Sequence, residues 1–160
     1  NAWLKGLSPK ENREVPPLRY DWAHRLKQER PALPVVLNGG IATLEAVRTQ
    51  LAHVDGVMLG RAAYHDPYLL HAADAMLAGR DVQPRAALLR ALQPYAEARM
   101  AEGVALKHIT RHILGLFHGQ PGGRMFRQIL SEGAHRADAD WALVERAIAA
   151  TETPRSRAAA

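Results

Sequence analysis

The chain of 160 residues contains no cysteine, which excludes a disulfide scaffold, a cysteine-ligated zinc site and a cysteine nucleophile within these residues. No apolar run approaches the length of about eighteen residues that a membrane-spanning helix requires, so we expect no membrane contact. The chain begins at Asn1 with neither a signal peptide nor an initiator methionine. We therefore expect a piece of a longer protein with a cytoplasmic location.

Acidic residues are scarce in the second half of the chain. Residues 83–160 hold 11 Lys and Arg against 7 Asp and Glu, whereas residues 1–82 hold 10 against 9. Between residues 103 and 136 a single acidic residue accompanies five basic residues and four histidines. A local basic excess of this kind indicates a polyanionic partner. The alternative is an ordinary solvated basic surface.

The first half contains a strand–helix–strand pattern. An apolar strand is predicted at 34–37 and ends in Asn-Gly-Gly at 38–40, and Thr43 is suited to cap the helix that follows. A second strand is predicted at 54–59 and ends in Gly-Arg at 60–61. This spacing indicates a βαβ unit, so the two strands should be parallel and buried.

The ends of both predicted strands have features of a phosphate site. Glycine lets the backbone approach an anion closely, and the N-terminus of a helix offers free N–H groups. Arg61 carries a planar cation that suits a phosphate or a carboxylate. In a (β/α)₈ barrel the loops after the seventh and eighth strands form the common phosphate site. The alternative is a tight βα loop with a structural Arg61 that pairs with Asp55 or Asp66.

The rest of the chain predicts helices. One helix is expected at 18–29, before the first strand, and another at 67–78, after a linker at 62–67. No strand pattern follows Pro84, and helices are predicted at 85–102, 104–117, 123–133 and 139–151. Pro94 should kink the first of these four. The expected fold is therefore α/β followed by an all-α helical bundle, with a boundary near 80–83.

Cationic side chains gather on two of the bundle helices. In the helix predicted at 104–117 an apolar face is opposed by a polar one, which carries Lys107, His108, Arg111 and His112. Arg124 and Arg127 stand three apart on the next helix, after the glycine-rich turn at 119–123. Arginine binds phosphate bidentately, which favours contact with a nucleic acid. His108 and His112 have the spacing of metal ligands but lack a third one, so no metal site is predicted.

The first seventeen residues predict a loop, because three prolines and a glycine interrupt any regular pattern. Lys10 and Arg13 give this loop a cationic tip. Long loops in compact domains are often functional, and the alternative is a surface loop with ordinary charges.

Taken together, these motifs resemble the bacterial tRNA-dihydrouridine synthases of the A subfamily, over about residues 1–150. The residues that carry the resemblance are 6–14 (GLSPKENRE), 16–18 (PPL), 38–41 (NGGI), 54–61 (VDGVMLGR), 108–117 (HITRHILGLF), 124–127 and 130–132 (LSE). The stretches at 6–14 and 38–41 are the specific ones.

The resemblance implies a fold and a set of site residues. Residues 1–80 would be the C-terminal part of an FMN-binding (β/α)₈ TIM barrel, residues 83–151 a helical tRNA-binding domain, and 152–160 a disordered tail. Asn38, Gly39 and Gly40 match the first FMN-phosphate loop of the family, and Gly60 and Arg61 match the second. The implied tRNA-binding residues are Lys10, Arg13, Arg124 and Arg127, with Lys107, His108, Arg111 and His112 as general RNA-surface candidates.

The resemblance also implies a reaction, namely reduction of uridine to 5,6-dihydrouridine at U20 and U20a of the tRNA D-loop, with FMN as cofactor and NADPH as reductant. The family's catalytic cysteine has no counterpart here, so no catalytic residue is assigned and we expect that cysteine upstream. We accordingly expect the 160 residues alone to lack synthase activity and to retain FMN poorly. We also expect the protein to be a monomer. The alternatives are a non-catalytic RNA-binding helical module attached to a phosphate-binding α/β segment, and a phosphate-binding barrel enzyme for a small substrate.

Overall fold

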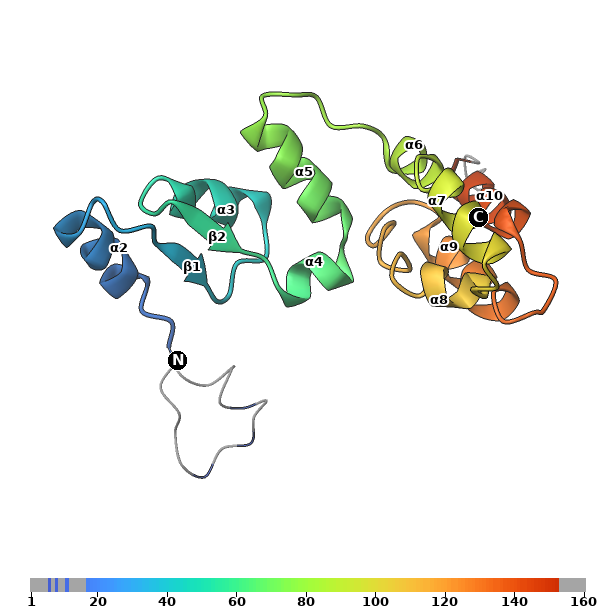
Figure 1. The fold of residues 1–160 in the computed structure, drawn as a ribbon, viewed down its shortest axis with the longest axis horizontal. Helices are drawn as coiled ribbons and strands as arrows, with labels where there is room; N and C mark the ends of the chain where they lie inside the picture. Colours follow the sequence, from blue (N-terminus) through green and yellow to red (C-terminus); the bar gives the residue numbers. More distant parts are fainter. Residues whose placement is uncertain (1–5, 7, 9–10, 12–16, 153–160) are drawn as a thin grey trace, which may run out of the picture. The chain divides into compact units, whose positions relative to one another are not determined.

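The computed structural model describes residues 17–152 together with residues 6, 8 and 11. Contacts between residues divide the chain into two units, Asn1–Arg61 and Ala62–Ala160. Figure 1 shows the order of their helices and strands along the chain. Among the described residues no helix is both long enough and apolar enough to cross a membrane.

The first unit contains a small parallel sheet. Its elements are α2 (Tyr20–Glu29), β1 (Val36–Asn38), α3 (Leu44–Leu51) and β2 (Gly56–Met58). The strands pair in parallel, with Val36 opposite Gly56 and Asn38 opposite Met58. The predicted βαβ unit is therefore confirmed, and the ends of both strands lie at the same edge of the sheet.

Both strands are shorter than the predicted 34–37 and 54–59. Pro34 has no N–H to contribute to a ladder. The Val35 N–H donates to the Asp55 carboxylate at 2.8 Å, so it is not available to a neighbouring strand. The ladder therefore begins only at Val36 and Gly56.

The two faces of this sheet differ. Val35 and Leu37 are buried in the same unit as Val47 of α3, which is 1% exposed. Val36 and Met58 alternate with them and lie on the opposite face, where they are 65% and 53% exposed. One face is thus covered, whereas the other presents apolar side chains, so the prediction that the two strands are buried is wrong for that face.

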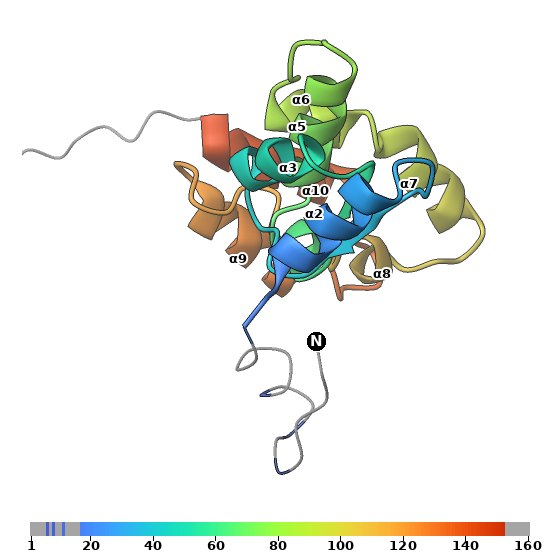
Figure 2. The same cartoon turned by 90° about the vertical axis from the view of Figure 1, so that its left-hand side faces the viewer.

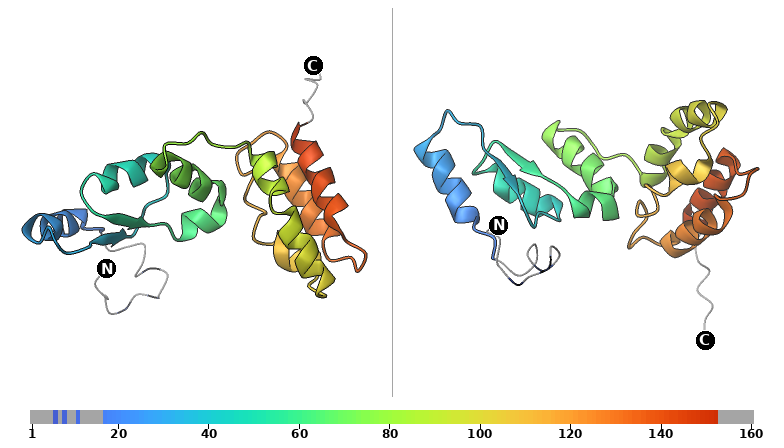
Figure 3. Two further views of the ribbon diagram at one scale, coloured as in Figure 1. Left: turned by 45° about the horizontal axis from the view of Figure 1, so that its top comes forward. Right: turned by 60° about the horizontal axis from the view of Figure 1, so that its bottom comes forward.

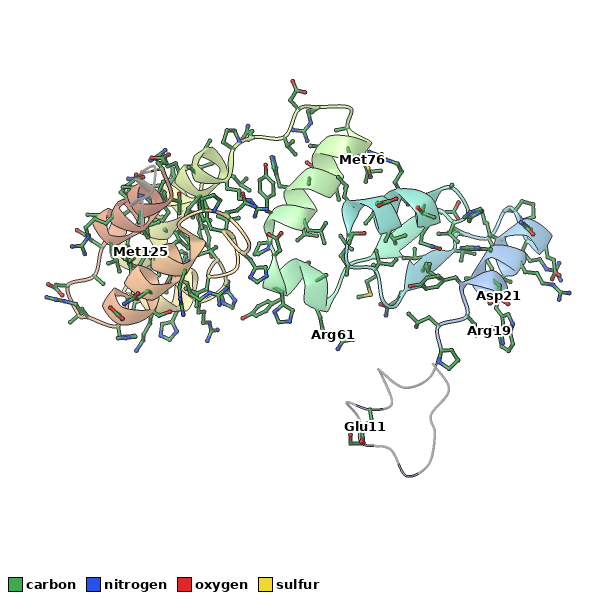
Figure 4. The ribbon with its side chains drawn as sticks, turned by 180° about the vertical axis from the view of Figure 1, so that it is seen from behind. Glu11, Arg19, Asp21, Arg61, Met76 and Met125 are labelled. Atoms are coloured by element: carbon green, nitrogen blue, oxygen red, sulfur yellow. The ribbon has the colours of Figure 1, made fainter. Side chains whose placement is uncertain are left out.

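Helix α2 is joined to the rest of the first unit by polar contacts, and it buries none of its residues. The His24 ring stacks on His53 with centroids 4.4 Å apart, and His24 Nε2 lies 2.8 Å from Gln50 Oε1. Figure 2, viewed from this end, shows α2 in front of α3. Arg19, just before the helix, pairs with Asp21 at 2.8 Å (Figure 4).

The second unit is helical and contains most of the hydrophobic core. Its helices are α4 (Arg61–His65, beginning at the last residue of the first unit), α5 (Tyr68–Leu77), α6 (Arg85–Arg90), α7 (Gln93–Ala101), α8 (Leu106–Thr110), α9 (Gly123–Gly133) and α10 (Trp141–Glu152). Helices α9 and α10 lie side by side (Figure 3). Phe126 and Leu130 of α9 are fully buried, as are Val144 and Ile148 of α10. The bundle is thus built around this helix pair.

Two predictions for the second unit are wrong. Residues 62–67 are not a linker, because α4 occupies Arg61–His65. The helix predicted at 104–117 ends as α8 at Thr110, and turns follow it. In these turns the N–H groups of Ile113, Leu116 and His118 each donate to the carbonyl three residues earlier. The apolar face expected there still points inward, since Leu106 and Leu116 are buried.

Pro94 also acts differently from the expectation. The helix predicted at 85–102 is two helices, α6 and α7, and Pro94 lies in the first turn of α7. An N–H in the first turn of a helix has no intrahelical partner, so proline is tolerated there and causes no kink.

The described residues also bear on the domain limits. The sequence places the boundary at 80–83, whereas contacts place it after Arg61, so residues 62–80 group with the helices that follow. A barrel domain at 1–80 stays a prediction. Glu152 belongs to α10. The remainder of the predicted tail, 153–160, lies outside the described residues.

Candidate functional site

The loop after β1 has a conformation that only glycine adopts easily. Gly39 and Gly40 have φ values of 129° and 65°. A Cβ on Gly39 would lie 2.9 Å from Leu18 Cδ2, and one on Gly40 would lie 2.9 Å from the Tyr20 hydroxyl. That hydroxyl donates a hydrogen bond to the Gly39 carbonyl at 2.6 Å. The loop is therefore fixed by Leu18, which precedes α2, and by Tyr20, the first residue of α2.

The loop after β2 is open, whereas the loop after β1 is closely packed. A Cβ on Gly60 would meet no atom within 4 Å. Arg61 begins α4, and Figure 4 shows its exposed side chain directed away from the ribbon. Because Asn38 lies opposite Met58, both glycine loops follow the same edge of the sheet. Backbone N–H groups, an open glycine and a guanidinium are a donor set that suits a phosphate group.

The alternative to a phosphate site is a structural Arg61 that pairs with Asp55 or Asp66. Each of these two carboxylates has another cationic partner. Asp55 pairs with Lys27 at 2.8 Å, and Asp66 pairs with Arg85 at 3.0 Å. The hydrogen bond from Lys27, together with the one from the Val35 N–H, holds the pKa of the Asp55 carboxyl below its ordinary value of 3.8. Asp55 therefore ties α2 to the start of β1.

A second candidate site lies at the start of α9. Arg124 and Arg127 are both exposed and line an open hollow of about 290 Å³. The other lining residues are Phe117, His118, Gly119, Gln120 and Gly123. The prediction that the two arginines share one face of a helix is confirmed, and the structure adds a concave surface between them and the preceding loop.

The glycine-rich turn holds this hollow in place. Gly122 has a φ of 73°, and a Cβ on it would overlap the Ala150 carbonyl of α10. A Cβ on Gly123 would overlap the Phe117 carbonyl. Both glycines thus permit close backbone packing, which fixes the start of α9 relative to the loop that completes the hollow.

The charges of Arg124 and Arg127 are not neutralised within the part of the chain that the structure describes. No ion pair holds either side chain there. Many other described arginines do pair with carboxylates, including Arg85 with Asp66, Arg90 with Glu145 and Glu152, and Arg136 with Asp138. Two uncompensated guanidinium groups beside one hollow can bind an anion of two or more phosphates.

The remaining predicted cations lie at α8 and just beyond it. Lys107, His108, Arg111 and His112 are all exposed, although α8 itself ends at Thr110. Arg111 Nε donates to His112 Nε2 at 3.0 Å. Within the described ranges no group of three or more histidine or acidic side chains is placed to hold a metal ion.

Some residues of interest were missed by sequence reasoning, and others cannot be placed. Lys10 and Arg13 lie outside the described residues. The sequence does not predict His118 and Gln120 as site residues, although His118 precedes the glycine-rich turn at 119–123 and Gln120 lies within it. Tyr64 was assigned to a linker, yet its ring lies against His112, and no pattern in the sequence signals that contact.

Comparison with known proteins gives a consistent result along the whole chain. The profile of the dihydrouridine synthase family matches residues 4–152. A tRNA-dihydrouridine(20/20a) synthase of Xanthomonas campestris is 71% identical over 160 residues, which is 100% of this chain and 48% of the relative. A protein of the same name from Xylella fastidiosa (strain 9a5c) is 62% identical over 99% of this chain and 47% of the relative.

A more distant relative agrees with these two. The tRNA-dihydrouridine(20/20a) synthase of Pseudomonas aeruginosa is 59% identical over 85% of this chain and 42% of its own length. The chain therefore spans about half the length of the curated relatives it matches, and it corresponds to their C-terminal part.

Proposed function

Because the chain belongs to the dihydrouridine synthase family, we propose that it is the C-terminal part of an enzyme that reduces uridine to 5,6-dihydrouridine at positions 20 and 20a of tRNA in the cytoplasm. The observation that carries this proposal is the similarity over the full length of the chain, at 71% identity, to a relative named for that reaction. The two candidate sites would supply the cofactor contact and the RNA contact that such a reaction needs.

We propose that the first unit and the residues up to 80 complete a TIM barrel, and that residues 83–151 form a tRNA-binding domain. The parallel βαβ unit supports the barrel, since alternating parallel strands and helices build it. The exposed apolar face with Val36 and Met58 also supports it, because strands of a barrel bury side chains on both faces.

The two strand-end loops are proposed to hold the phosphate of FMN. The backbone N–H groups of Gly39 and Gly40 would donate to the phosphate oxygens, with Asn38 beside them. The open space at Gly60 would let the backbone approach the phosphate, and Arg61 would neutralise its charge. Bound FMN, reduced by NADPH, would supply the hydride for the C5–C6 double bond of uracil.

The tRNA is proposed to bind along the basic side of the helical unit. Arg124 and Arg127 would bind backbone phosphates at the hollow before α9, with Lys107 and Arg111 as further contacts. Lys10 and Arg13 would bind the tRNA near the target base. These contacts fix the register of the RNA, and hence which uridine leaves its stack to reach the flavin. The proton donor of the reaction is not among these residues, since the chain has no cysteine.

The test of the proposal is a map of dihydrouridine in tRNA from a strain that lacks the gene. We expect dihydrouridine to disappear at positions 20 and 20a, and to return when the wild-type gene is restored. Unchanged dihydrouridine at both positions in the deleted strain would overturn the proposed activity. In that case, tRNA binding by the purified protein would favour the non-catalytic RNA-binding alternative.

A further inference from the structure

An exposed aromatic ring lies beside the basic residues that follow α8. Tyr64 of α4 is 61% exposed. Its ring meets the His112 ring edge-on, with centroids 6.0 Å apart and an interplanar angle of 79°. The Tyr64 hydroxyl lies 3.5 Å from His112 Nδ1. Forty-eight residues separate the two in sequence, so only the fold brings them together.

The hydrogen bonds of His112 define the tautomer of its ring. The guanidinium of Arg111 can only donate, so His112 Nε2 must accept the 3.0 Å bond from Arg111 Nε. The proton of the neutral ring is then on Nδ1, where it faces the Tyr64 hydroxyl. The three side chains form one connected chain that orients the Arg111 guanidinium, whose other N–H groups remain available. No carboxylate pairs with Arg111 in the described part of the molecule.

The backbone that carries Tyr64 is anchored to the segment that carries His112. A Cβ on Gly115 would overlap the His65 carbonyl, so these two backbones are in direct contact. Arg85 binds both Asp66, at 3.0 Å, and the Leu116 carbonyl. Its guanidinium also lies 3.9 Å from the centroid of the Tyr68 ring. The arrangement of Tyr64 and His112 is therefore preorganised, and a ligand need not create it.

We propose that Tyr64, His112 and Arg111 form a nucleotide-binding site for an unstacked residue of the tRNA. The proposal rests on the proposed function and deepens it. The Tyr64 ring stacks on a base, and Arg111, oriented by His112, binds the adjoining phosphate. An exposed aromatic ring beside cations is the arrangement by which proteins hold unpaired RNA bases. Between residues 103 and 136 one acidic residue accompanies five basic ones, and this basic excess suits a polyanion such as RNA.

The chain contains a matched control for Tyr64. Tyr95 of α7 belongs to the same helical unit and is 58% exposed. No ring contact and no cation–π contact involves it among the described residues. A tyrosine that merely occupies the surface should behave like Tyr95.

The experiment measures tRNA affinity and dihydrouridine formation by the purified holoenzyme that contains this chain. Stacking of one base changes affinity by about 5- to 150-fold. We therefore expect Tyr64→Ala to weaken tRNA binding and raise KM by a factor in that range, while kcat at saturating tRNA stays near that of the wild type. Tyr64→Phe should retain tRNA affinity, because it keeps the ring, whereas Tyr64→Leu should lose it. Tyr95→Ala should leave the affinity unchanged.

Arg111→Ala should reduce the slope of log affinity against log salt by about 1, and Tyr64→Ala should leave that slope unchanged.

The outcomes distinguish this inference from the proposed function. If the wild-type holoenzyme forms dihydrouridine at positions 20 and 20a but Tyr64→Ala and Tyr95→Ala bind tRNA equally well, the nucleotide site is wrong and the proposed function stands. If Tyr64→Phe is as weak as Tyr64→Ala, stacking is not the role of the ring and the inference is overturned. If the wild-type holoenzyme forms no dihydrouridine, the proposed function itself fails.

Discussion

At the scale of single residues, the glycines of the two strand-end loops serve different purposes. Gly40 is required by the protein itself, because its φ is 65° and a side chain would meet Leu18 and Tyr20. Gly60 faces open space, so nothing in the described protein requires a glycine there. A glycine at position 60 would instead serve the close approach of the FMN phosphate that we propose.

This difference predicts opposite effects of one substitution at the two positions. Gly60→Ala should leave the free energy of unfolding within about 0.5 kcal/mol of wild type but weaken FMN binding. Gly40→Ala should destabilise the protein by about 1–3 kcal/mol, because alanine is strained at positive φ. Thermal unfolding without cofactor and flavin-fluorescence titration measure the two effects. Unchanged FMN affinity in Gly60→Ala would remove this residue from the cofactor site.

Asp55 predicts a pH dependence of stability. The hydrogen bonds that it accepts from Lys27 and from the Val35 N–H lower the pKa of the folded carboxyl below the ordinary 3.8. A lowered carboxyl pKa stabilises the folded state above the unfolded value, and this stabilisation is lost as pH falls through the folded pKa. Asp55→Asn should therefore be less stable than wild type at about pH 7, and the difference should shrink as pH falls below about 3.8.

Urea unfolding of wild type and Asp55→Asn across this pH range provides the measurement. Asp81→Asn is the matched control, since no ion pair holds Asp81 among the described residues. A stability difference between wild type and Asp55→Asn that stays constant down to about pH 2 would contradict the role given to the ionised carboxylate.

At the scale of secondary-structure elements, α4 and the turns after α8 depend on each other. Both were predicted wrongly from local patterns, as a linker and as a continuous helix. The contact of Gly115 with the His65 carbonyl joins the two segments, and Arg85 reinforces the junction through Asp66 and the Leu116 carbonyl. No local periodicity in the sequence predicts this long-range contact.

The junction predicts a large effect of adding one methyl group. Gly115→Ala should destabilise the helical unit by about 1–3 kcal/mol or more, because the Cβ would overlap a backbone oxygen that no rotamer change can move aside. Gly60→Ala is the control, since its Cβ would contact nothing. Equal unfolding midpoints for Gly115→Ala and wild type would show that the two segments are not packed as described.

At the scale of the whole molecule, the uncompensated cations of the helical unit lie where we propose RNA contact. Arg124 and Arg127 differ from the ion-paired arginines, and they line a hollow that tertiary packing creates. Arg146 lines a different hollow, near Arg136 and Asp138, and provides a comparison with the same charge.

We predict that Arg124→Ala with Arg127→Ala weakens tRNA binding by the holoenzyme and reduces the slope of log affinity against log salt by about 1–2, because each phosphate contact contributes about 0.7–0.9 to that slope. Arg146→Ala should leave the slope unchanged. Binding isotherms at several salt concentrations give the comparison. An equal loss for Arg146→Ala would indicate a general electrostatic effect of net charge, with no defined site at the hollow.

The sequence by itself determined the βαβ unit, the course of α9 and the candidate cations Arg124 and Arg127. Those features depend on local periodicity, on glycine and proline positions and on residue type, which can be read along the chain. Only the tertiary structure decided that Tyr64 lies against His112 and that His118 and Gln120 face the two arginines across a hollow. These arrangements depend on packing between segments up to 48 residues apart, and that packing follows from close backbone contacts which no local pattern encodes.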